Sequence, residues 1–352
     1  MCRRLWFFAH AITILLCLVG VSAPAFAQSQ VVEVKVHSPS LEHNLLGDPA
    51  DQDVVIYLPA TYRVEPERRF ATIYFLHGFA DTKPKGVADI LQPLMDKLIT
   101  SRVIEPMIVV APNGLNRYFG SFYTNSEVTG DWDDYLTRDV VDYVDTHFRT
   151  LTSVASRGIM GHSMGGYGAL MLGFKHPEVF SNIYAMSPCC TILDADIGPS
   201  SSIWSRTQQI KSAAALSDLL KQDFLLVVAV AMNAAFAPNP RTQPMLGDPP
   251  FKLRGQQQVP DPIALSKFQQ NIVTNAVPLL LPKIHQLQGI YIDYGAEDEF
   301  SHIPPGARAL SAQLALSGVP HILEVYEGDH GNHVRQRVEE CALPWFSKRL
   351  KH

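Results

Sequence analysis

The chain lacks an excess of basic residues. Its 352 residues include 29 lysines and arginines against 34 aspartates and glutamates, for a formal net charge of −5. A protein that neutralises nucleic-acid phosphates needs a basic surface, so this composition argues against nucleic acid as a partner. Hydrophobic residues make up 47% of the chain, which is enough to bury a large core. A globular protein of enzyme size is therefore expected.

Cysteine is also scarce, with five in the whole chain. Cys2 and Cys17 lie in the N-terminal segment, which leaves Cys189, Cys190 and Cys341. In an oxidising compartment Cys341 could form a disulfide with Cys189 or with Cys190, but not with both at once. The alternative is that all three are buried thiols that pack as small apolar groups. None has the neighbours of a zinc ligand or a catalytic thiol, and we expect neither a metal nor an organic cofactor.

Long apolar runs are absent after the N-terminus. Arg3 and Arg4 precede an apolar run over residues 5–21, and small residues follow it as far as Ala27. This order is typical of a secretory signal peptide, residues 1–27, and predicts a secreted or periplasmic protein. An uncleaved membrane anchor is the alternative. The next apolar segment, 224–236, is too short to span a bilayer, so no stable membrane insertion is expected after signal cleavage. The sequence does not predict the oligomeric state.

Short β-rich runs alternate with helical patterns from residue 28 to the end. Residues 31–36 and 53–58 alternate apolar and polar side chains, which is typical of antiparallel strands with one solvated face. Almost continuously apolar runs, typical of parallel strands covered on both faces, follow at residues 71–76, 107–111, 158–160, 182–186 and 290–294. The alternation predicts a doubly wound, mostly parallel α/β sheet in one domain over residues 28–352.

One stretch, residues 191–285, interrupts this alternation. It carries several helical patterns around a loop rich in proline and glycine, 237–250. An insertion at this place would lie over the edge of the sheet as a helical cap. A peripheral decoration that never contacts substrate is the alternative.

The most informative motif is Gly161-His162-Ser163-Met164-Gly165, which follows an apolar strand and opens into a helix. A serine between glycines at this spacing indicates the nucleophile elbow of an α/β-hydrolase fold. The sharp turn would strain Ser163 and leave no room for side chains at positions 161 and 165. The backbone N–H of Met164 would then point at negative charge developing on the substrate.

A nucleophilic serine needs a base, and the base needs an acid that fixes its tautomer. In this fold the acid precedes the base along the chain. Asp298 follows the strand at 290–294 and is the best placed acid, and Asp293, Glu297 and Glu299 are the weaker candidates.

His330 is the predicted base, because it lies between two glycines in the loop after the last strand. His333 is its rival, and the two could also form a pair of metal ligands, but no third ligand of matching spacing accompanies them. The second oxyanion donor is expected from the loop at Leu76-His77-Gly78-Phe79, as the backbone N–H of Phe79. His77 and His162 are expected to have structural roles.

With these residues placed, the chain resembles the esterase D-like family of α/β-hydrolases. That family includes S-formylglutathione hydrolases, feruloyl and acetyl xylan esterases, enterochelin esterases and mycolyltransferases. The resemblance implies that Ser163, Asp298 and His330 form a catalytic triad and that Phe79 and Met164 supply the oxyanion amides. The motifs that carry it are Leu76-His77-Gly78, Tyr123-Thr124-Asn125-Ser126, Trp132-Asp133-Asp134-Tyr135-Leu136, Gly161-His162-Ser163-Met164-Gly165-Gly166, 293–300, Gly328-Asp329-His330 and Leu343-Pro344-Trp345-Phe346.

These observations predict an exported serine carboxylesterase that acts on a small-molecule, carbohydrate or lipid ester. An acyltransferase of mycolyltransferase type is the alternative, because an alcohol can replace water at the acyl-enzyme. A binding protein that has lost activity is a third. Tyr123 and Trp132 are the predicted substrate-binding residues. Tyr123 belongs to an aromatic loop expected to border the pocket, for which simple packing is the alternative.

Overall fold

A computed structural model describes residues 28–81 and 84–352, without side chains for residues 84–88. The predicted signal peptide, residues 1–27, lies outside the described residues. In the part of the chain that is described, no helix is both long enough and apolar enough to cross a bilayer.

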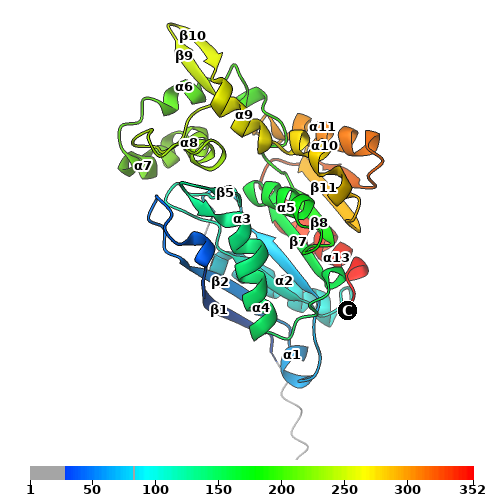
Figure 1. Ribbon diagram of the computed structural model, residues 1–352. Helices are drawn as coiled ribbons and strands as arrows, with labels where there is room; N and C mark the ends of the chain where they lie inside the picture. The colour runs from blue at the N-terminus through cyan, green and yellow to red at the C-terminus, as the bar shows by residue number, and fades with distance from the viewer. Residues whose placement is uncertain (1–27, 82–83) are drawn as a thin grey trace, which may run out of the picture.

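The core of the molecule is an eight-stranded sheet with the strand order β1-β2-β4-β3-β7-β8-β11-β12 (Figure 1). Strand β2 runs antiparallel to both of its neighbours, and every other pair in the sheet is parallel. The predicted parallel sheet with antiparallel N-terminal strands is thus confirmed. The strands are β1 (Gln30–His37), β2 (Asp51–Leu58), β3 (Thr72–Leu76), β4 (Ile108–Pro112), β7 (Arg157–His162), β8 (Asn182–Met186), β11 (Gly289–Gly295) and β12 (Ile322–Tyr326).

Each central strand is apolar on both sides because helices cover both faces. In β3, Tyr74 and Leu76 join one buried cluster, whereas Ile73 and Phe75 join the other. Helices α4 (Val141–His147), α5 (Met164–Lys175) and α11 (Ile303–Leu316) lie on the first face, and α10 (Val273–Ile284) packs against α5 and α11. Helices α2 (Pro84–Thr100) and α13 (Leu343–Arg349) pack on the second.

The segment predicted to be a cap forms a layer beyond the sheet and its helices. Most of its elements project from one end of the sheet in Figure 1, whereas α10 lies beside α5 and α11. The projecting elements are α6 (Ile203–Thr207), α7 (Leu216–Gln222), α8 (Phe224–Phe236), β9 (Phe251–Arg254), β10 (Gln257–Pro260) and α9 (Pro262–Gln270). The remaining short elements are α1 (Thr61–Val64), β5 (Asn125–Ser126), β6 (Gly130–Asp131), α3 (Trp132–Asp134) and α12 (Val334–Arg337).

A chain of aromatic rings joins this layer to the sheet. Tyr167 of α5 and Phe122 contact Phe236 of α8, with ring centroids 5.6 and 5.2 Å apart. Phe236 contacts Phe268 of α9 at 5.5 Å, and Phe268 contacts Trp204 of α6 at 5.3 Å. Edge-on and tilted aromatic pairs of this kind add to the stabilisation from burial. The projecting layer therefore shares a continuous core with the sheet.

The three cysteines beyond the N-terminal segment are free thiols. Cys189 and Cys190 belong to the buried cluster on the α5 face, and Cys341 packs against the cluster on the opposite face. Because the sheet lies between them, Cys341 forms no disulfide with Cys189 or Cys190. The structure thus corrects the predicted disulfide in favour of the alternative, unpaired thiols.

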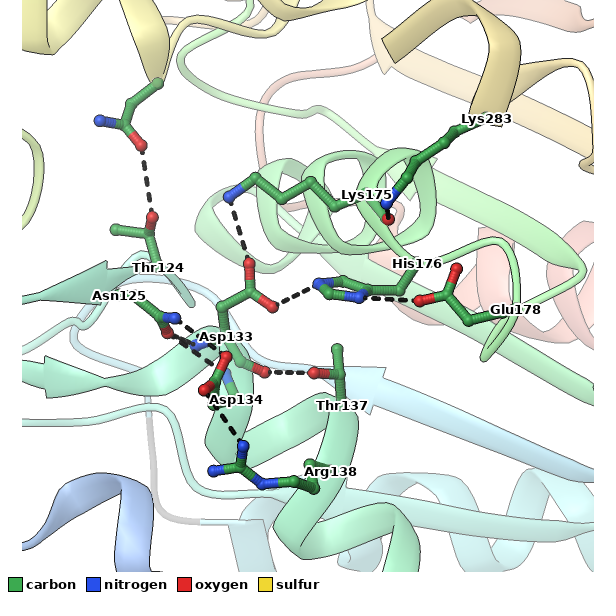
Figure 2. A network of polar contacts seen from close by, with 11 residues as sticks. Thr124, Asn125, Asp133, Asp134, Thr137, Arg138, Lys175, His176, Glu178 and Lys283 are labelled. Atoms are coloured by element: carbon green, nitrogen blue, oxygen red, sulfur yellow. Dashed lines mark hydrogen bonds and ion pairs between the residues drawn. The ribbon is translucent and has the colours of Figure 1, made fainter.

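Asp133, from one of the family motifs, is a structural residue that joins α3 to the end of α5 (Figure 2). Its carboxylate accepts hydrogen bonds from Lys175 Nζ at 3.1 Å and His176 Nε2 at 2.7 Å. The Asn125 side-chain oxygen accepts from the backbone N–H groups of Asp133 and Asp134 at 2.9 and 3.2 Å, and so holds the start of α3.

Candidate active site

Ser163 occupies the sharp turn that the sequence predicts. Strand β7 ends at His162 and helix α5 begins at Met164, so Ser163 alone makes the change of direction. Its backbone angles are φ 57° and ψ −117°. A non-glycine residue at such angles is strained by about 1–3 kcal/mol, and strain of this kind is characteristic of functional sites. Ser163 is partly exposed and lines a cavity, so a substrate can reach it.

The glycines on either side of Ser163 are required by close backbone contacts. A Cβ at position 161 would lie 2.3 Å from the carbonyl oxygen of Gly165. A Cβ at position 165 would lie 2.0 Å from the carbonyl oxygen of Leu76. Both distances are far below van der Waals contact, so only glycine allows β7, β3 and α5 to meet at this turn.

The structure brings His330 and Asp298 into direct contact. The ring nitrogen Nδ1 of His330 lies 2.8 Å from Oδ2 of Asp298, whose side chain is fully buried. A carboxylate can only accept, so Nδ1 carries the hydrogen and Nε2 is left to accept a proton. This is the arrangement of the base and acid in a serine hydrolase.

The weaker acid candidates have other partners. Glu299 accepts a hydrogen bond from the backbone N–H of His330 at 3.1 Å, and Glu297 accepts one from Gly328 at 2.6 Å. Both therefore hold the backbone of the loop that carries His330, residues 327–333, which we call the histidine loop. Asp293 is buried elsewhere, where Tyr184 and Arg337 donate to its carboxylate.

His162 connects the Ser163 turn to the histidine loop. Its Nε2 lies 2.8 Å from the carbonyl oxygen of His330, and the two rings are 4.6 Å apart. Burial, and to a smaller extent the neighbouring His330, lower the pKa of His162 to about 3. The ring is therefore neutral at pH 7 and donates from Nε2 to that carbonyl. Phe300 also packs edge-on against the His330 ring, with the ring centroids 4.6 Å apart.

Phe79 and Met164 line the same cavity as Ser163. The loop before Phe79 runs close to the nucleophile, because a Cβ on Gly78 would lie 3.6 Å from Cβ of Ser163. Over residues 28–81 and 84–352, the backbone N–H groups of Phe79 and Met164 have no hydrogen-bond acceptor. Two free donors beside a nucleophile are what an oxyanion hole requires.

Buried His77 supports this loop, as expected. Its Nδ1 donates to the carbonyl of Gly78 at 2.8 Å, and its Nε2 accepts from the N–H of Gly114 at 2.8 Å. Burial lowers the pKa of His77, so the neutral ring that this bonding pattern needs is favoured.

The structure gives Tyr123 and Trp132 packing roles. Both are fully buried, and neither lines the cavity beside Ser163. The Tyr123 hydroxyl donates to the carbonyl of His77 at 3.0 Å, and Trp132 Nε1 donates to the carbonyl of Thr129 at 2.7 Å. We therefore do not carry their predicted substrate-binding role into the proposal below.

The cavity beside Ser163 is narrow and mostly apolar. Four of its lining residues come from α8, namely Phe224, Leu225, Val228 and Met232. The sequence placed residues 224–236 within the predicted cap, 191–285, but did not indicate which of its side chains would line the cavity. The projecting layer thus contacts the space where a substrate of Ser163 would lie.

His330 and His333 have different hydrogen-bond partners. His330 contacts Asp298, whereas Nδ1 of His333 lies 2.8 Å from the side-chain oxygen of Gln336. Across the described ranges, no three histidine, cysteine, aspartate or glutamate side chains come together as metal ligands would.

A protein-family model with the description "Putative esterase" matches residues 49–336, most of the chain and all of the site described above. The chain belongs to this esterase family. Membership confirms the resemblance drawn from the motifs.

Relatives of this esterase-family chain match about a third of its length. A protein from Xylanibacter ruminicola, named endo-1,4-beta-xylanase/feruloyl esterase, is 26% identical over 136 residues, which are 37% of this chain and 18% of that protein. An acetyl esterase from Caldicellulosiruptor saccharolyticus is 29% identical over 127 residues, which are 34% of this chain and 42% of that protein. The matches thus span less than half the length of either relative.

Solved structures match almost the whole chain. A ferulic acid esterase has a TM-score of 0.64 at 19% identity, over 92% of this chain and 99% of that one. The S-formylglutathione hydrolase FrmB from Staphylococcus aureus has a TM-score of 0.57 at 16% identity, over 91% and 99%. These likenesses establish the α/β-hydrolase fold of this esterase-family member.

Proposed function

We propose that this protein is an exported serine carboxylesterase that hydrolyses its substrate through an acyl-enzyme. One observation carries the proposal. A serine strained at the end of β7 lies beside a histidine loop whose ring is held by a buried carboxylate. Membership of the esterase family supports the same activity.

In the proposed mechanism, His330 Nε2 takes the hydroxyl proton of Ser163 as Oγ attacks the ester carbonyl. The negative oxygen that forms accepts hydrogen bonds from the backbone N–H groups of Phe79 and Met164. His330 then donates its proton to the departing alcohol, which leaves an acyl group on Ser163. Water then attacks this ester as His330 takes one of its protons, and His330 returns that proton to Oγ of Ser163 as the bond to the acyl group breaks and the carboxylic acid leaves. Asp298 keeps the hydrogen on Nδ1 throughout.

The substrate is proposed to carry its acyl group in the narrow apolar cavity next to Ser163. Rings from Phe79, Phe122 and Phe224 line that cavity, so apolar or aromatic acyl groups suit it better than charged ones. The feruloyl and acetyl esterases among the relatives are consistent with a small-molecule or carbohydrate ester. Export rests on the basic and apolar pattern of residues 1–27.

The activity is tested with p-nitrophenyl acetate and a fluorophosphonate probe. Ser163→Ala should lose probe labelling and at least about 10³-fold in kcat/KM, because it removes the nucleophile. Ser101→Ala, at an exposed serine outside the cavity, is the matched control. Full activity in Ser163→Ala would refute the proposal. Product analysis with added alcohol distinguishes hydrolysis from acyl transfer, and predominant transfer would replace hydrolysis with the acyltransferase alternative.

Export is tested separately on the full chain expressed in a bacterium. The protein should appear outside the cytoplasm with residues 1–27 removed, as judged by intact mass. Retention of the full-length mass in the cytoplasm would refute export and leave the esterase activity untouched.

A further inference from the structure

A second histidine–carboxylate pair lies at the wall of the Ser163 cavity. His302 lines the cavity, and only 4% of its surface is exposed. Its ring Nδ1 is 2.7 Å from Oδ1 of Asp196, and its backbone N–H donates to the same oxygen at 3.0 Å. Asp196 lies in a short 3-10 turn, Ala195–Ile197, near the start of the inserted segment.

The carboxylate decides which nitrogen of His302 faces the cavity as an acceptor. Burial alone would raise the pKa of Asp196, but the hydrogen bonds that its carboxylate accepts from the ring and the backbone N–H of His302 outweigh burial and lower the pKa. Asp196 is therefore ionised at pH 7 and can only accept, which places the His302 hydrogen on Nδ1. In the neutral ring Nε2 then carries a lone pair.

That lone pair has no protein partner. Nε2 of His302 is buried and makes no hydrogen bond to any residue of the described ranges. A buried polar atom left unpaired costs about 1–3 kcal/mol, so such atoms normally have a partner or mark a binding site. The ring belongs to the cavity wall, so a molecule in the cavity is the partner that can supply a donor.

Few other polar side chains line this cavity. Apart from Ser163, the lining side chains within the described residues are apolar or are the thiols of Cys189 and Cys190. Those two thiols contact each other, with their sulfurs 2.9 Å apart. Among the described side chains that line the cavity, His302 is therefore the one strong acceptor besides Ser163.

We propose that His302, oriented by Asp196, selects substrates whose acyl group carries a hydroxyl. The hydrocarbon part of the acyl group would lie against the apolar wall, and its hydroxyl would donate to Nε2 of His302. This inference rests on the proposed esterase function, because it places the acyl group beside Ser163. It concerns which ester is preferred and adds no step to the reaction.

The test uses sets of three p-nitrophenyl esters on the full-length protein. The members of a set share one acyl skeleton and carry hydrogen, hydroxyl or methoxy at one position. Sets built on 3-phenylpropanoyl and octanoyl skeletons place this substituent at different depths in the cavity. In at least one set, kcat/KM for the hydroxyl ester should exceed both others at least tenfold. A site built around an acceptor disfavours partners that cannot donate. Equal rates throughout every set, or preference for methoxy, would overturn the inference.

Variants identify the residue responsible. In His302→Phe, which keeps a ring but removes the nitrogens, the hydroxyl-to-hydrogen ratio of kcat/KM should fall to about one. His302→Gln, which restores an acceptor, should recover part of the ratio and serves also if the phenylalanine variant does not fold. His285→Phe, an exposed histidine outside the cavity, is the matched control. An unchanged ratio in both His302 variants would overturn the inference.

A binding measurement separates this inference from the proposed function. Ser163→Ala should bind the hydroxyl ester at least tenfold more tightly than its hydrogen partner in titration calorimetry, and the double variant with His302→Phe should not. Such a difference would support the recognition role even if wild-type protein hydrolysed no ester. Active wild-type protein without any difference in rate or binding would overturn the inference and leave the esterase function standing.

Discussion

A single methyl group decides whether the turn at Ser163 can form. In Gly165→Ala the new Cβ would lie 2.0 Å from the Leu76 carbonyl oxygen, so the backbone must move. We expect the free energy of unfolding to fall by about 3 kcal/mol or more, measured by urea denaturation. Gly331→Ala is the control, because its Cβ would meet no atom within 4 Å and should change stability by less than about 0.5 kcal/mol. Equal effects of the two substitutions would contradict the packing described for the turn.

The carboxylate of Asp298 should matter more for catalysis than its acidic neighbours. Asp298→Asn puts an amide that can donate beside Nδ1 of His330, which favours the tautomer unable to take the serine proton. We expect kcat/KM on p-nitrophenyl acetate to fall about 10³–10⁴-fold. Glu297→Gln changes a side chain that accepts from the backbone N–H of Gly328, and kcat/KM should fall less than about tenfold. The reverse order of effects would argue for a different acid.

Sequence motifs could locate residues whose position follows from the end of a strand. They could not assign a role where the same residue type is used both for core packing and for substrate contact. Ser163 follows β7 and Asp298 follows β11, two parallel strands separated only by β8, so both residues lie at the same edge of the sheet. Tyr123 is aromatic whether it packs a core or contacts a substrate, and its burial was invisible in the sequence. Asp196 and His302 are far apart in the chain and match no motif, so only the folded chain reveals them as a pair.

At the scale of elements, the contacts of Asp133 fasten α3 to α5 through paired charges. Burial opposes protonation of His176, but the hydrogen bond and charge of Asp133, with help from Glu178, outweigh it and raise the pKa of His176. Burial would also raise the pKa of Asp133, but His176 and Lys175 outweigh it and lower that pKa. Both partners are therefore charged between the unfolded-state pKa values, about 4 for aspartate and about 6.5 for histidine.

This coupling predicts a pH-dependent contribution to stability. A raised histidine pKa stabilises the folded state fully below about pH 6.5, and the contribution disappears as pH rises through the folded-state pKa. His176→Gln should therefore lose about 1–3 kcal/mol at pH 5.5 and less at pH 8.5, measured by urea unfolding. His285→Gln, at an exposed histidine, should show no such trend. If the loss of unfolding free energy in His176→Gln grew as the pH rose, the charges assigned to His176 and Asp133 would be contradicted.

The element pattern was predictable where the hydrophobic period is plain. The continuous apolar runs gave the parallel strands because burial on both faces leaves no polar positions. The range 191–285 was expected as one insertion, yet α10 within it packs on α5 and α11. Proline-containing helices such as α10 look alike in sequence whether they cover a sheet or a substrate, so their layer depends on the tertiary contacts.

At the scale of the whole molecule, the aromatic chain through Phe236 predicts that the projecting layer and the sheet unfold as one unit. Phe236→Ala would remove ring contacts to Tyr167, Phe122 and Phe268 at once, which should cost about 3–5 kcal/mol. Hydrogen exchange followed by mass spectrometry should give α8 and α5 the same opening free energy in the wild type, and an earlier opening of α8 in the variant. Leu253→Ala, on the exposed face of β9, is the control.

If α8 exchanged before α5 in the wild type, the prediction that the projecting layer and the sheet unfold together would be contradicted. It would mean that the projecting layer is held by its own contacts and not by those to the sheet.

The vicinal thiols of Cys189 and Cys190 have a consequence for inhibitor studies. Both cysteines line the cavity that also contains Ser163. An organomercurial or maleimide that reached either sulfur would fill the space in which we propose that the acyl group binds. Loss of turnover after such treatment would then report obstruction, and it should not be taken as the signature of a cysteine nucleophile.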